Sequence, residues 1–332
     1  MNYRSIADLN ATIERNLHRF PSDIDLVIGI PRSGLLAASM LALAINVPFT
    51  DVEGFIAGRV LATGRTRRRD TFDKPVSEIQ TIVVLDDSIS SGNSMANVRA
   101  SLVSAYPDKN FVFTAAYGTR PSHTEADLIL DVVKHPRIFQ WNLFHHDLLD
   151  QCCVDIDGVL CLDPTTQEND DGSAYLRFLL EAQRKFIPTK RVGYLVTSRL
   201  EKYRANTEEW LARQNITYRE LIMLDLPSKS ERIRLAPHGR FKGEFYRASD
   251  ALLFIESEIG QARQIAQVSG KPVLCIENQQ MFLPDRISVE ALERRASALT
   301  HFVRGGLPLK RFARQMLGQT MYNKLKDYAG KQ

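Results

Sequence analysis

Two hydrophobic patterns take turns along this chain of 332 residues. Apolar runs of about four to eight residues are typical of strands buried on both faces, whereas apolar residues three or four positions apart indicate helices. In the first half the runs predict strands at 25–30, 47–54, 81–87, 111–118 and 126–133, with helices at 5–19, from 34 onward and at 94–106. Strands that alternate with helices predict a parallel, doubly wound α/β sheet.

The same alternation begins again after a short polar stretch at 145–151. Strands are predicted at 152–160, 191–199, 220–226, 251–257 and 271–278, with helices at 203–214 and 260–270. The length also fits two domains, at roughly 150 residues each. We therefore predict two α/β domains, at 1–148 and 151–285, and a helical basic C-terminal extension at 286–332.

Charge is distributed unevenly along the chain. The formal net charge is +4, but residues 301–332 hold seven Lys or Arg and one acid, which leaves 36 basic and 38 acidic residues in the rest. A second basic segment has five arginines, Arg59, Arg65, Arg67, Arg68 and Arg69. Neither segment has interleaved aromatic residues or a groove-reading motif, which disfavours nucleic acid as a partner.

The cysteines and the apolar segments predict where in the cell the protein is located. The four cysteines have no zinc spacing and are predicted to be reduced, mostly buried thiols of a cytoplasmic protein. The apolar stretch at 35–45 is too short to span a bilayer, so no membrane is expected.

Two adjacent acids and a hydroxyl-rich loop follow the strand at 81–87. Asp86 and Asp87 end the strand, and the loop consists of Ser90, Ser91, Gly92, Asn93 and Ser94. Backbone N–H groups at the start of a helix bind phosphate, although no Walker sequence is present. A capped helix after a buried strand would explain the loop alone. Two buried carboxylates, however, cost stability unless a ligand hydroxyl, a cation or a backbone donor meets them.

This combination resembles the 5-phosphoribosyl-1-diphosphate (PRPP) signature of the type I phosphoribosyltransferases, including those of the orotate type. The resemblance implies that Asp86 and Asp87 hold the ribose 2- and 3-hydroxyls and that residues 90–94 hold the 5-phosphate. Asn93 stands where the family usually has glycine or threonine. The string IGIPRSG at 28–34 resembles the pyrophosphate loop of the family, with Arg32, Ser33 and Gly34 as its donors.

Two further segments of the first half acquire expected roles from this resemblance. The arginine-rich loop at 59–69 lies where the family has a mobile catalytic loop, and none of its five arginines is preferred. The segment 135–146 is expected to form the hood that recognises the base. Phe139 and Trp141 would either stack on a ring there or pack in the core.

The second half places two carboxylates two residues apart at the end of its first strand. Asp155 and Asp157 therefore share a face before a glycine turn, where like charges repel unless a cation separates them. An acidic turn would explain a bare DxD, but the string CVDIDGVLC resembles motif one of the haloacid dehalogenase-like (HAD) phosphatases. The resemblance implies that Asp155 attacks phosphorus and that Asp157 is the general acid/base.

The remaining HAD motifs are expected in order along the chain. The resemblance implies Thr197, with Ser198, as the hydroxyl donor, and Lys242 as the motif-three lysine, with Lys229 as the alternative. Magnesium would be bound by Asp155, Asp157 and Glu256. The family usually has aspartate at the last position and a second acid where this chain has Gly260 and Gln261, and Glu258 is the candidate substitute. Residues 160–192 leave no room for a large cap, so cover from the first domain or from the second subunit of a homodimer is expected.

Together the resemblances imply a bifunctional enzyme, similar to fusions encoded near bacterial tellurite-resistance-type stress genes. Its expected ligands are PRPP, a base or nucleotide, phosphate esters and Mg²⁺. The expected reactions are phosphoribosyl transfer, in either direction, and phosphomonoester hydrolysis, which in tandem would yield a nucleoside. The alternative is a PRPP-sensing regulatory module fused to a phosphatase.

Overall fold

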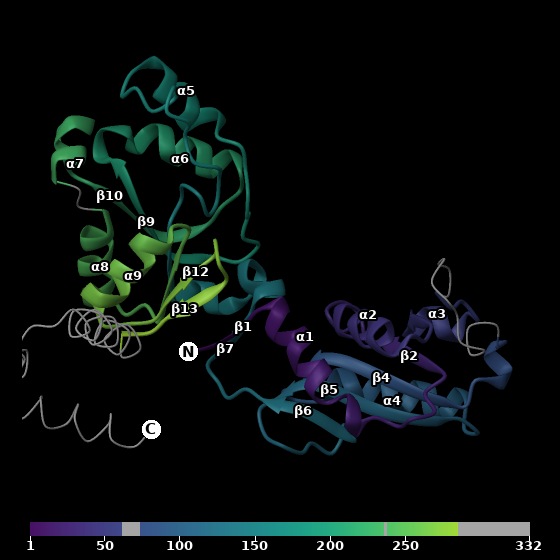
Figure 1. The fold of residues 1–332 in the computed structure, drawn as a ribbon. Coiled ribbons are helices and arrows are strands. Elements are labelled where there is room, and N and C mark those ends of the chain that lie inside the picture. The colour runs from purple at the N-terminus through teal and green to yellow at the C-terminus, as the bar shows by residue number, and fades with distance from the viewer. Residues whose placement is uncertain (62–73, 236–237, 285–332) are drawn as a thin grey trace, which may run out of the picture.

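The computed structural model describes residues 1–61, 74–235 and 238–284, which form two α/β units (Figure 1). The first contains a five-stranded parallel sheet in the order β3-β2-β4-β5-β6. Its strands are β2 (Leu26–Gly29), β3 (Phe49–Asp51), β4 (Thr81–Ser88), β5 (Asn110–Gly118) and β6 (Leu128–Val132). Its α-helices are α1 (Ile6–Arg15), α2 (Gly34–Ile45), α3 (Val52–Ile56) and α4 (Asn93–Ala105).

Both faces of this sheet are buried, as the apolar runs predict. Alternate residues of a strand point to opposite faces, and in β4 Val83 packs in one cluster with α1 and α2 while Val84 packs in another with α3 and α4. Because helices cover both faces, the doubly wound architecture predicted for the first half is confirmed. The four cysteines are all buried and free, as predicted.

The second unit has a six-stranded sheet in the order β10-β9-β8-β11-β12-β13, parallel except for its last strand. Its strands are β8 (Cys152–Val154), β9 (Val192–Leu200), β10 (Tyr218–Leu224), β11 (Leu253–Glu256), β12 (Val273–Cys275) and β13 (Gln280–Phe282). Its α-helices are α5 (Ser173–Glu181), α6 (Arg204–Arg213), α7 (Lys229–Leu235), α8 (His238–Ala248) and α9 (Ile259–Ser269). It is therefore an α/β unit, and its HAD-like character remains a prediction.

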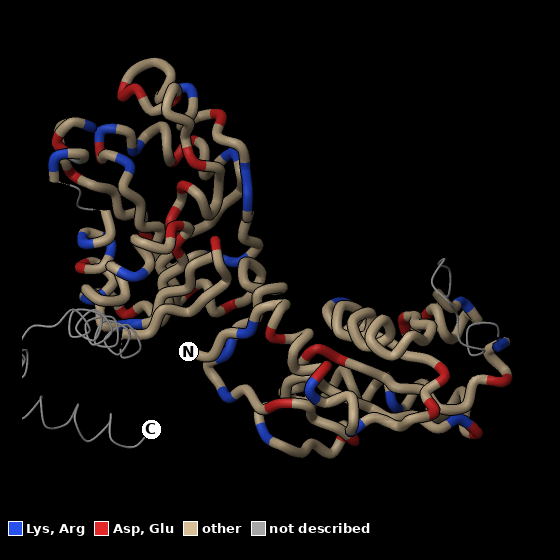
Figure 2. Tube along the Cα trace, in the orientation of Figure 1, with Lys and Arg blue, Asp and Glu red and all other residues tan. Residues whose placement is uncertain are grey.

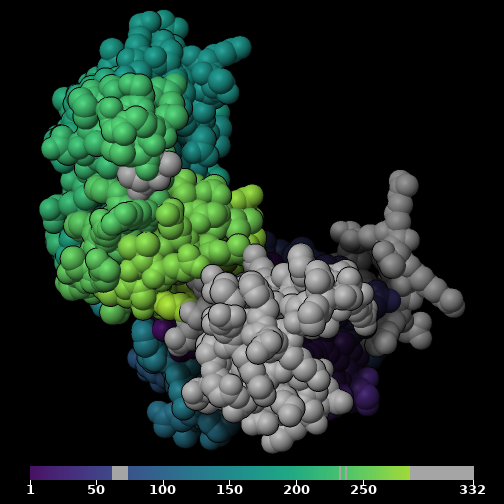
Figure 3. All heavy atoms as spheres, turned by 60° about the vertical axis from the view of Figure 1, so that its left-hand side comes forward, coloured from purple at the N-terminus to yellow at the C-terminus, as the bar shows by residue number. Residues whose placement is uncertain are grey.

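The two units are joined through a small parallel sheet of β1 (Asn2–Arg4) and β7 (Arg137–Phe139). After β7 the chain forms two 3₁₀ segments, Gln140–His145 and Asp147–Gln151, and enters β8. Tyr3 and Ile138 pack in a core cluster of the second unit, and the Tyr3 hydroxyl donates to Gln279. The domain boundary predicted at the polar stretch 145–151 remains a prediction. Side chains that precede this stretch, Tyr3 and Ile138, nevertheless pack in the core of the second unit. The space-filling view shows the second unit as one contiguous mass (Figure 3).

Residues of both charges are mixed along the described parts of the chain. Figure 2 shows Lys and Arg interspersed with Asp and Glu along both units. No helix of the described part is long and apolar enough to cross a membrane. Four of the five loop arginines (Arg65, Arg67, Arg68 and Arg69) and the predicted extension at 286–332 lie outside the described residues.

Candidate active sites

The two predicted loops of the first unit meet at the carboxyl ends of β2 and β4. Gly34 begins α2 so close to β4 that an added Cβ would lie 2.8 Å from the Leu85 carbonyl oxygen and 3.0 Å from Asp86 Oδ1. The Ser33 hydroxyl donates to Asp87 Oδ1 at 2.8 Å. The structure thus brings the predicted pyrophosphate loop and the acid pair together, and glycine at position 34 permits the approach.

The two acids differ in their surroundings. Asp87 is 5% exposed and receives Ser33 on one oxygen and the Trp141 indole N–H on the other, at 2.8 Å. Asp86 Oδ1 accepts the backbone N–H of Asp87 at 2.9 Å. Burial, followed by the charge of Asp87, raises the pKa of Asp86 to about 8. Near neutral pH the pair therefore holds one proton on Asp86, and a nearby cation would favour its release.

The hydroxyl-rich loop leads directly into α4. Gly92 has φ +84°, in the left-handed region that favours glycine, and Asn93 is the first helical residue. The side chains of Ser90, Ser91, Asn93 and Ser94 are exposed, so the loop is open to a ligand. An added Cβ on Gly92 would lie 2.3 Å from His123, so a histidine ring borders the loop. The structure places the loop as predicted, while its phosphate role remains a proposal.

Trp141 links the predicted hood to the acid pair. Its ring lies parallel to Phe139, with centroids 4.9 Å apart and planes at 2°, and Phe139 stacks on Tyr117 at 5.4 Å. Phe139 is 4% exposed. Of its two predicted roles, stacking on a base or packing in the core, the structure therefore favours packing in the core. Trp141 is partly buried, and its hydrogen bond to Asp87 was not anticipated from the sequence. Arg32 is exposed, as is Arg59, the one described arginine of the 59–69 loop.

The second unit brings Asp155, Glu256 and Lys242 together at the carboxyl ends of β8 and β11. Lys242 Nζ, from α8, lies 2.6 Å from Asp155 Oδ2 and 2.8 Å from Glu256 Oε2. It also lies 3.1 Å from the amide oxygen of Gln261 on α9. All three charged side chains are at most 7% exposed. Of the two candidate lysines, Lys242 is the one that meets the predicted nucleophile.

Two carboxylates share one ammonium in this cluster. Burial lowers the pKa of Lys242, but Asp155 and Glu256 outweigh it, so that pKa is raised and the amine stays charged. Burial raises the pKa of Asp155, Lys242 opposes the shift, and Glu256 adds to it. The pKa of Asp155 is therefore raised overall, and its buried carboxyl group lies beside the fixed positive charge of Lys242.

Arg199 is a site residue that sequence reasoning missed. Its fully buried guanidinium holds the Asp157 carboxylate, with Nη2 2.7 Å from Oδ1 and Nε 3.1 Å from Oδ2. It follows the TS pair of β9, where Thr197 is buried and accepts the Arg199 N–H at 3.2 Å. Ser198 instead lines the cavity beside Asp155. The local signal was an arginine near the end of the buried strand β9.

The other predicted residues also lie near this cavity, of about 390 Å³. Glu258 caps α9 and accepts the N–H groups of Gly260 and Gln261 at 2.7 and 2.8 Å. Lys229 begins α7, and its ammonium contacts the Asn169 carbonyl oxygen. Both residues line the cavity, so their predicted roles as substitutes remain open.

The predicted magnesium ligands do not converge in this arrangement. Asp157 is committed to Arg199, while Asp155 and Glu256 are committed to Lys242. Among the described residues, no group of three or more His, Cys, Asp or Glu side chains is placed to hold a metal ion. The assignment of Asp155, Asp157 and Glu256 as Mg²⁺ ligands stays a prediction, and in this structure these carboxylates pair with Lys242 and Arg199.

Comparison with known proteins finds similarity for the first unit. Residues 2–151, less than half of the chain, match the family described as "Phosphoribosyl transferase domain". A Helicobacter pylori xanthine-guanine-hypoxanthine phosphoribosyltransferase is 18% identical over 42% of this chain and 92% of its own, with a TM-score of 0.32. A Pyrococcus horikoshii purine phosphoribosyltransferase is 17% identical over the same shares, with a TM-score of 0.27. No curated protein matches the chain. Residues 2–151, which form the first α/β unit, are thus similar to a phosphoribosyl transferase domain.

Proposed function

We propose that the first domain transfers a phosphoribosyl group between PRPP and a base. The observation that carries this proposal is the junction of Ser33 and Gly34 with Asp86 and Asp87, beside a phosphate-type loop at the start of α4. One ligand would satisfy all three features: a pyrophosphate, ribose hydroxyls and a 5-phosphate. The family match at residues 2–151 supports the same reaction class.

Each part of the site has a distinct role in this reaction. The backbone N–H groups of residues 90–94 hold the 5-phosphate, and the acid pair accepts the ribose hydroxyls. Residues 32–34 hold the pyrophosphate while the bond to the ribose carbon breaks and the base nitrogen takes its place. Mg²⁺ that arrives with PRPP would offset pyrophosphate charge, and its approach would favour release of the proton that Asp86 holds.

Isotope exchange between pyrophosphate and PRPP, with a panel of purine, pyrimidine and modified bases, tests this proposal. We expect base-dependent exchange and nucleotide formation, both lost in the Asp86→Asn, Asp87→Asn double variant. PRPP binding without exchange for any base would instead support the sensing module. Absence of PRPP binding by calorimetry would refute both.

A second candidate function, phosphomonoester hydrolysis, is favoured by the Lys242 contact with Asp155 at the edge of a cavity. Asp155 attacks phosphorus, the ester oxygen leaves with a proton from Asp157, and water that gives a proton back to Asp157 then cleaves the aspartyl phosphate. Lys242 offsets the charge between nucleophile and phosphate, and Arg199 orients Asp157 beside them. Asp155→Asn should abolish hydrolysis of acetyl phosphate and of nucleotides. Assays with and without Mg²⁺ decide whether a metal joins the site.

In tandem the two domains would convert PRPP and a base into a nucleoside. The transferase product is a nucleoside 5-monophosphate, and its hydrolysis would draw the reversible transfer forward. Mass spectrometry of products should show nucleoside from the parent and accumulated monophosphate from Asp155→Asn. Monophosphate from both proteins would refute the tandem scheme and leave the transferase proposal standing.

A further inference from the structure

A second cavity lies beside the one that contains Asp155. It has a volume of about 370 Å³ and lies between α5 and the segment that follows the Asp157 turn. Asp163 lines both cavities, so they adjoin each other at this residue. The volume falls within the range of about 300–1,000 Å³ typical of small-molecule sites. A group attached to a phosphate at Asp155 would therefore have a space to occupy.

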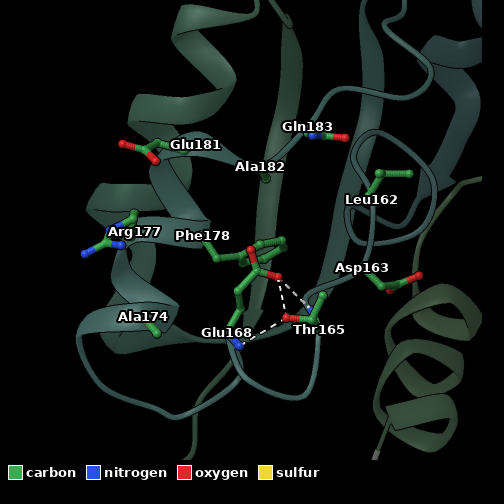
Figure 4. A pocket seen from close by; sticks show the side chains of 10 residues that line it. All are labelled: Leu162, Asp163, Thr165, Glu168, Ala174, Arg177, Phe178, Glu181, Ala182 and Gln183. Atoms are coloured by element: carbon green, nitrogen blue, oxygen red, sulfur yellow. Dashed lines mark hydrogen bonds between the residues drawn. The ribbon is translucent and has the colours of Figure 1, made fainter.

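The inner part of this cavity is apolar and partly aromatic. Figure 4 shows the Phe178 ring at its centre, with Leu162 and Ala182 on the neighbouring segments. Phe178 is 6% exposed and stacks on Tyr175 at 5.9 Å, so its ring is fixed in place. A fixed aromatic ring and aliphatic side chains suit a flat, partly apolar group rather than a bare sugar.

The polar side chains around the cavity are mainly carboxylates. The cavity is lined by three acids, Asp163, Glu168 and Glu181, by one cation, Arg177, and by the neutral residues Thr165 and Gln183. Glu168 Oε2 accepts the backbone N–H and the hydroxyl of Thr165 at 2.9 and 2.8 Å, which fixes its carboxylate next to Phe178 (Figure 4). Carboxylates accept hydrogen bonds from hydroxyl groups and repel a second phosphate.

We propose that this cavity binds the nucleoside part of a nucleoside 5-monophosphate whose phosphate lies at Asp155, and that its acidic rim selects monophosphates over diphosphates. The inference rests on the proposed hydrolysis and names its substrate class. Phe178 and Leu162 contact the base, and the carboxylates accept the ribose hydroxyls. Because the first domain's proposed product is a monophosphate of this kind, the cavity also accounts for the joining of the two domains.

Two variants and two substrates test this assignment. Ala182→Leu fills part of the cavity, and Glu168→Gln removes a charge but keeps an oxygen for Thr165. Uridine 5-monophosphate extends into the cavity, whereas acetyl phosphate does not. We expect Ala182→Leu to lower kcat/KM for uridine 5-monophosphate about tenfold and to leave acetyl phosphate within about twofold. Glu168→Gln should raise the rate on uridine 5-diphosphate, relative to the monophosphate, about tenfold. Glu220→Gln, an exposed change on β10, is the matched control.

Calorimetry with uridine alone separates this inference from the hydrolysis proposal. We expect uridine to bind the parent and to bind Ala182→Leu about tenfold more weakly, whether or not any ester is hydrolysed. If no ester is hydrolysed but uridine still binds the parent more tightly than Ala182→Leu, the hydrolysis proposal is refuted. The assignment of the cavity as a nucleoside site then stands. Equal uridine binding by parent and Ala182→Leu, or equal hydrolysis of ribose 5-phosphate and uridine 5-monophosphate, would overturn the cavity assignment.

Discussion

Asp86 and Asp87 are adjacent, yet replacing each with asparagine should change stability in opposite directions. Asp86 has a pKa raised to about 8 by burial and by the charge of Asp87. The folded protein thus holds a proton that the unfolded chain, with an ordinary value of 3.8, releases. The stability that Asp86 contributes is complete below pH 3.8 and is lost as the pH rises through about 8.

The magnitude follows from this shift. Four pKa units correspond to at most about 6 kcal/mol of unfolding free energy, and water entering the partly exposed site reduces that figure. Asp86→Asn, which cannot ionise, should stabilise the first domain by about 2–6 kcal/mol at pH 9 and by less at pH 6. Asp87→Asn loses a charged acceptor for Ser33 and Trp141 and should destabilise the domain by about 1–3 kcal/mol at both pH values.

Urea unfolding at pH 6 and pH 9 measures both effects. The chain has two tryptophans, so Trp141 fluorescence in a shared Trp210→Phe background reports on the first domain alone. Both variants should lose PRPP binding, so Asp86→Asn should be more stable than the parent and yet unable to bind PRPP. An unfolding free energy of Asp86→Asn with the same pH dependence as the parent would refute the assignment of the raised pKa to Asp86.

Three further changes probe contacts that the sequence did not reveal or could not rank. Trp141→Phe removes the indole N–H that donates to Asp87. Because hydrogen bonds to charged groups contribute about 1.5–3 kcal/mol, PRPP binding measured by calorimetry should weaken about tenfold or more. An unchanged PRPP affinity would mean that Asp87 does not contact the ribose. Gly34→Ala places a Cβ 2.8 Å from the Leu85 carbonyl oxygen and should raise KM for pyrophosphate more than it changes kcat. Lys242→Met leaves the buried side chains of Asp155 and Glu256 without their ammonium partner. It should lower the unfolding free energy of the second unit by about 3–5 kcal/mol, and the loss should grow as the pH rises. A variant that is as stable as the parent at pH 9 would contradict the charge assigned to Lys242.

Strand positions were predictable because burial on both faces of a parallel sheet produces continuous apolar runs. The runs at 25–30 and 81–87 correspond to β2 and β4. Helix α8 was not predicted, because its sequence contains Gly239 and Gly243, both unfavourable in helices. The structure shows their purpose: a Cβ on Gly243 would lie 2.7 Å from the Val268 side chain on α9. Close packing of two helices here outweighs local propensity.

The strand-end residues of the candidate sites were predictable for a related reason. In parallel sheets the carboxyl ends of neighbouring strands share one edge, so Asp86 on β4 and the loop after β2 had to approach each other. The same rule brings Asp155 after β8 near Glu256 on β11. Sequence order and strand pairing together fix such encounters without any knowledge of the side-chain contacts.

The pairings within each site were not predictable, because they depend on which charges meet in three dimensions. Trp141 and Asp87 are 54 residues apart, and Arg199 and Asp157 are 42 apart. The two acids of the DxD pair meet different cations, Asp157 an arginine on β9 and Asp155 a lysine on α8. A motif therefore locates the carboxylates, but only their partners distinguish a nucleophile beside a lysine from a carboxylate held by an arginine. In the proposed hydrolysis this difference decides which acid attacks phosphorus, so Asp155→Asn and Asp157→Asn should differ. The first should prevent formation of the aspartyl phosphate, and the second should allow it to form and slow its release, a difference that intact-protein mass spectrometry with acetyl phosphate would detect.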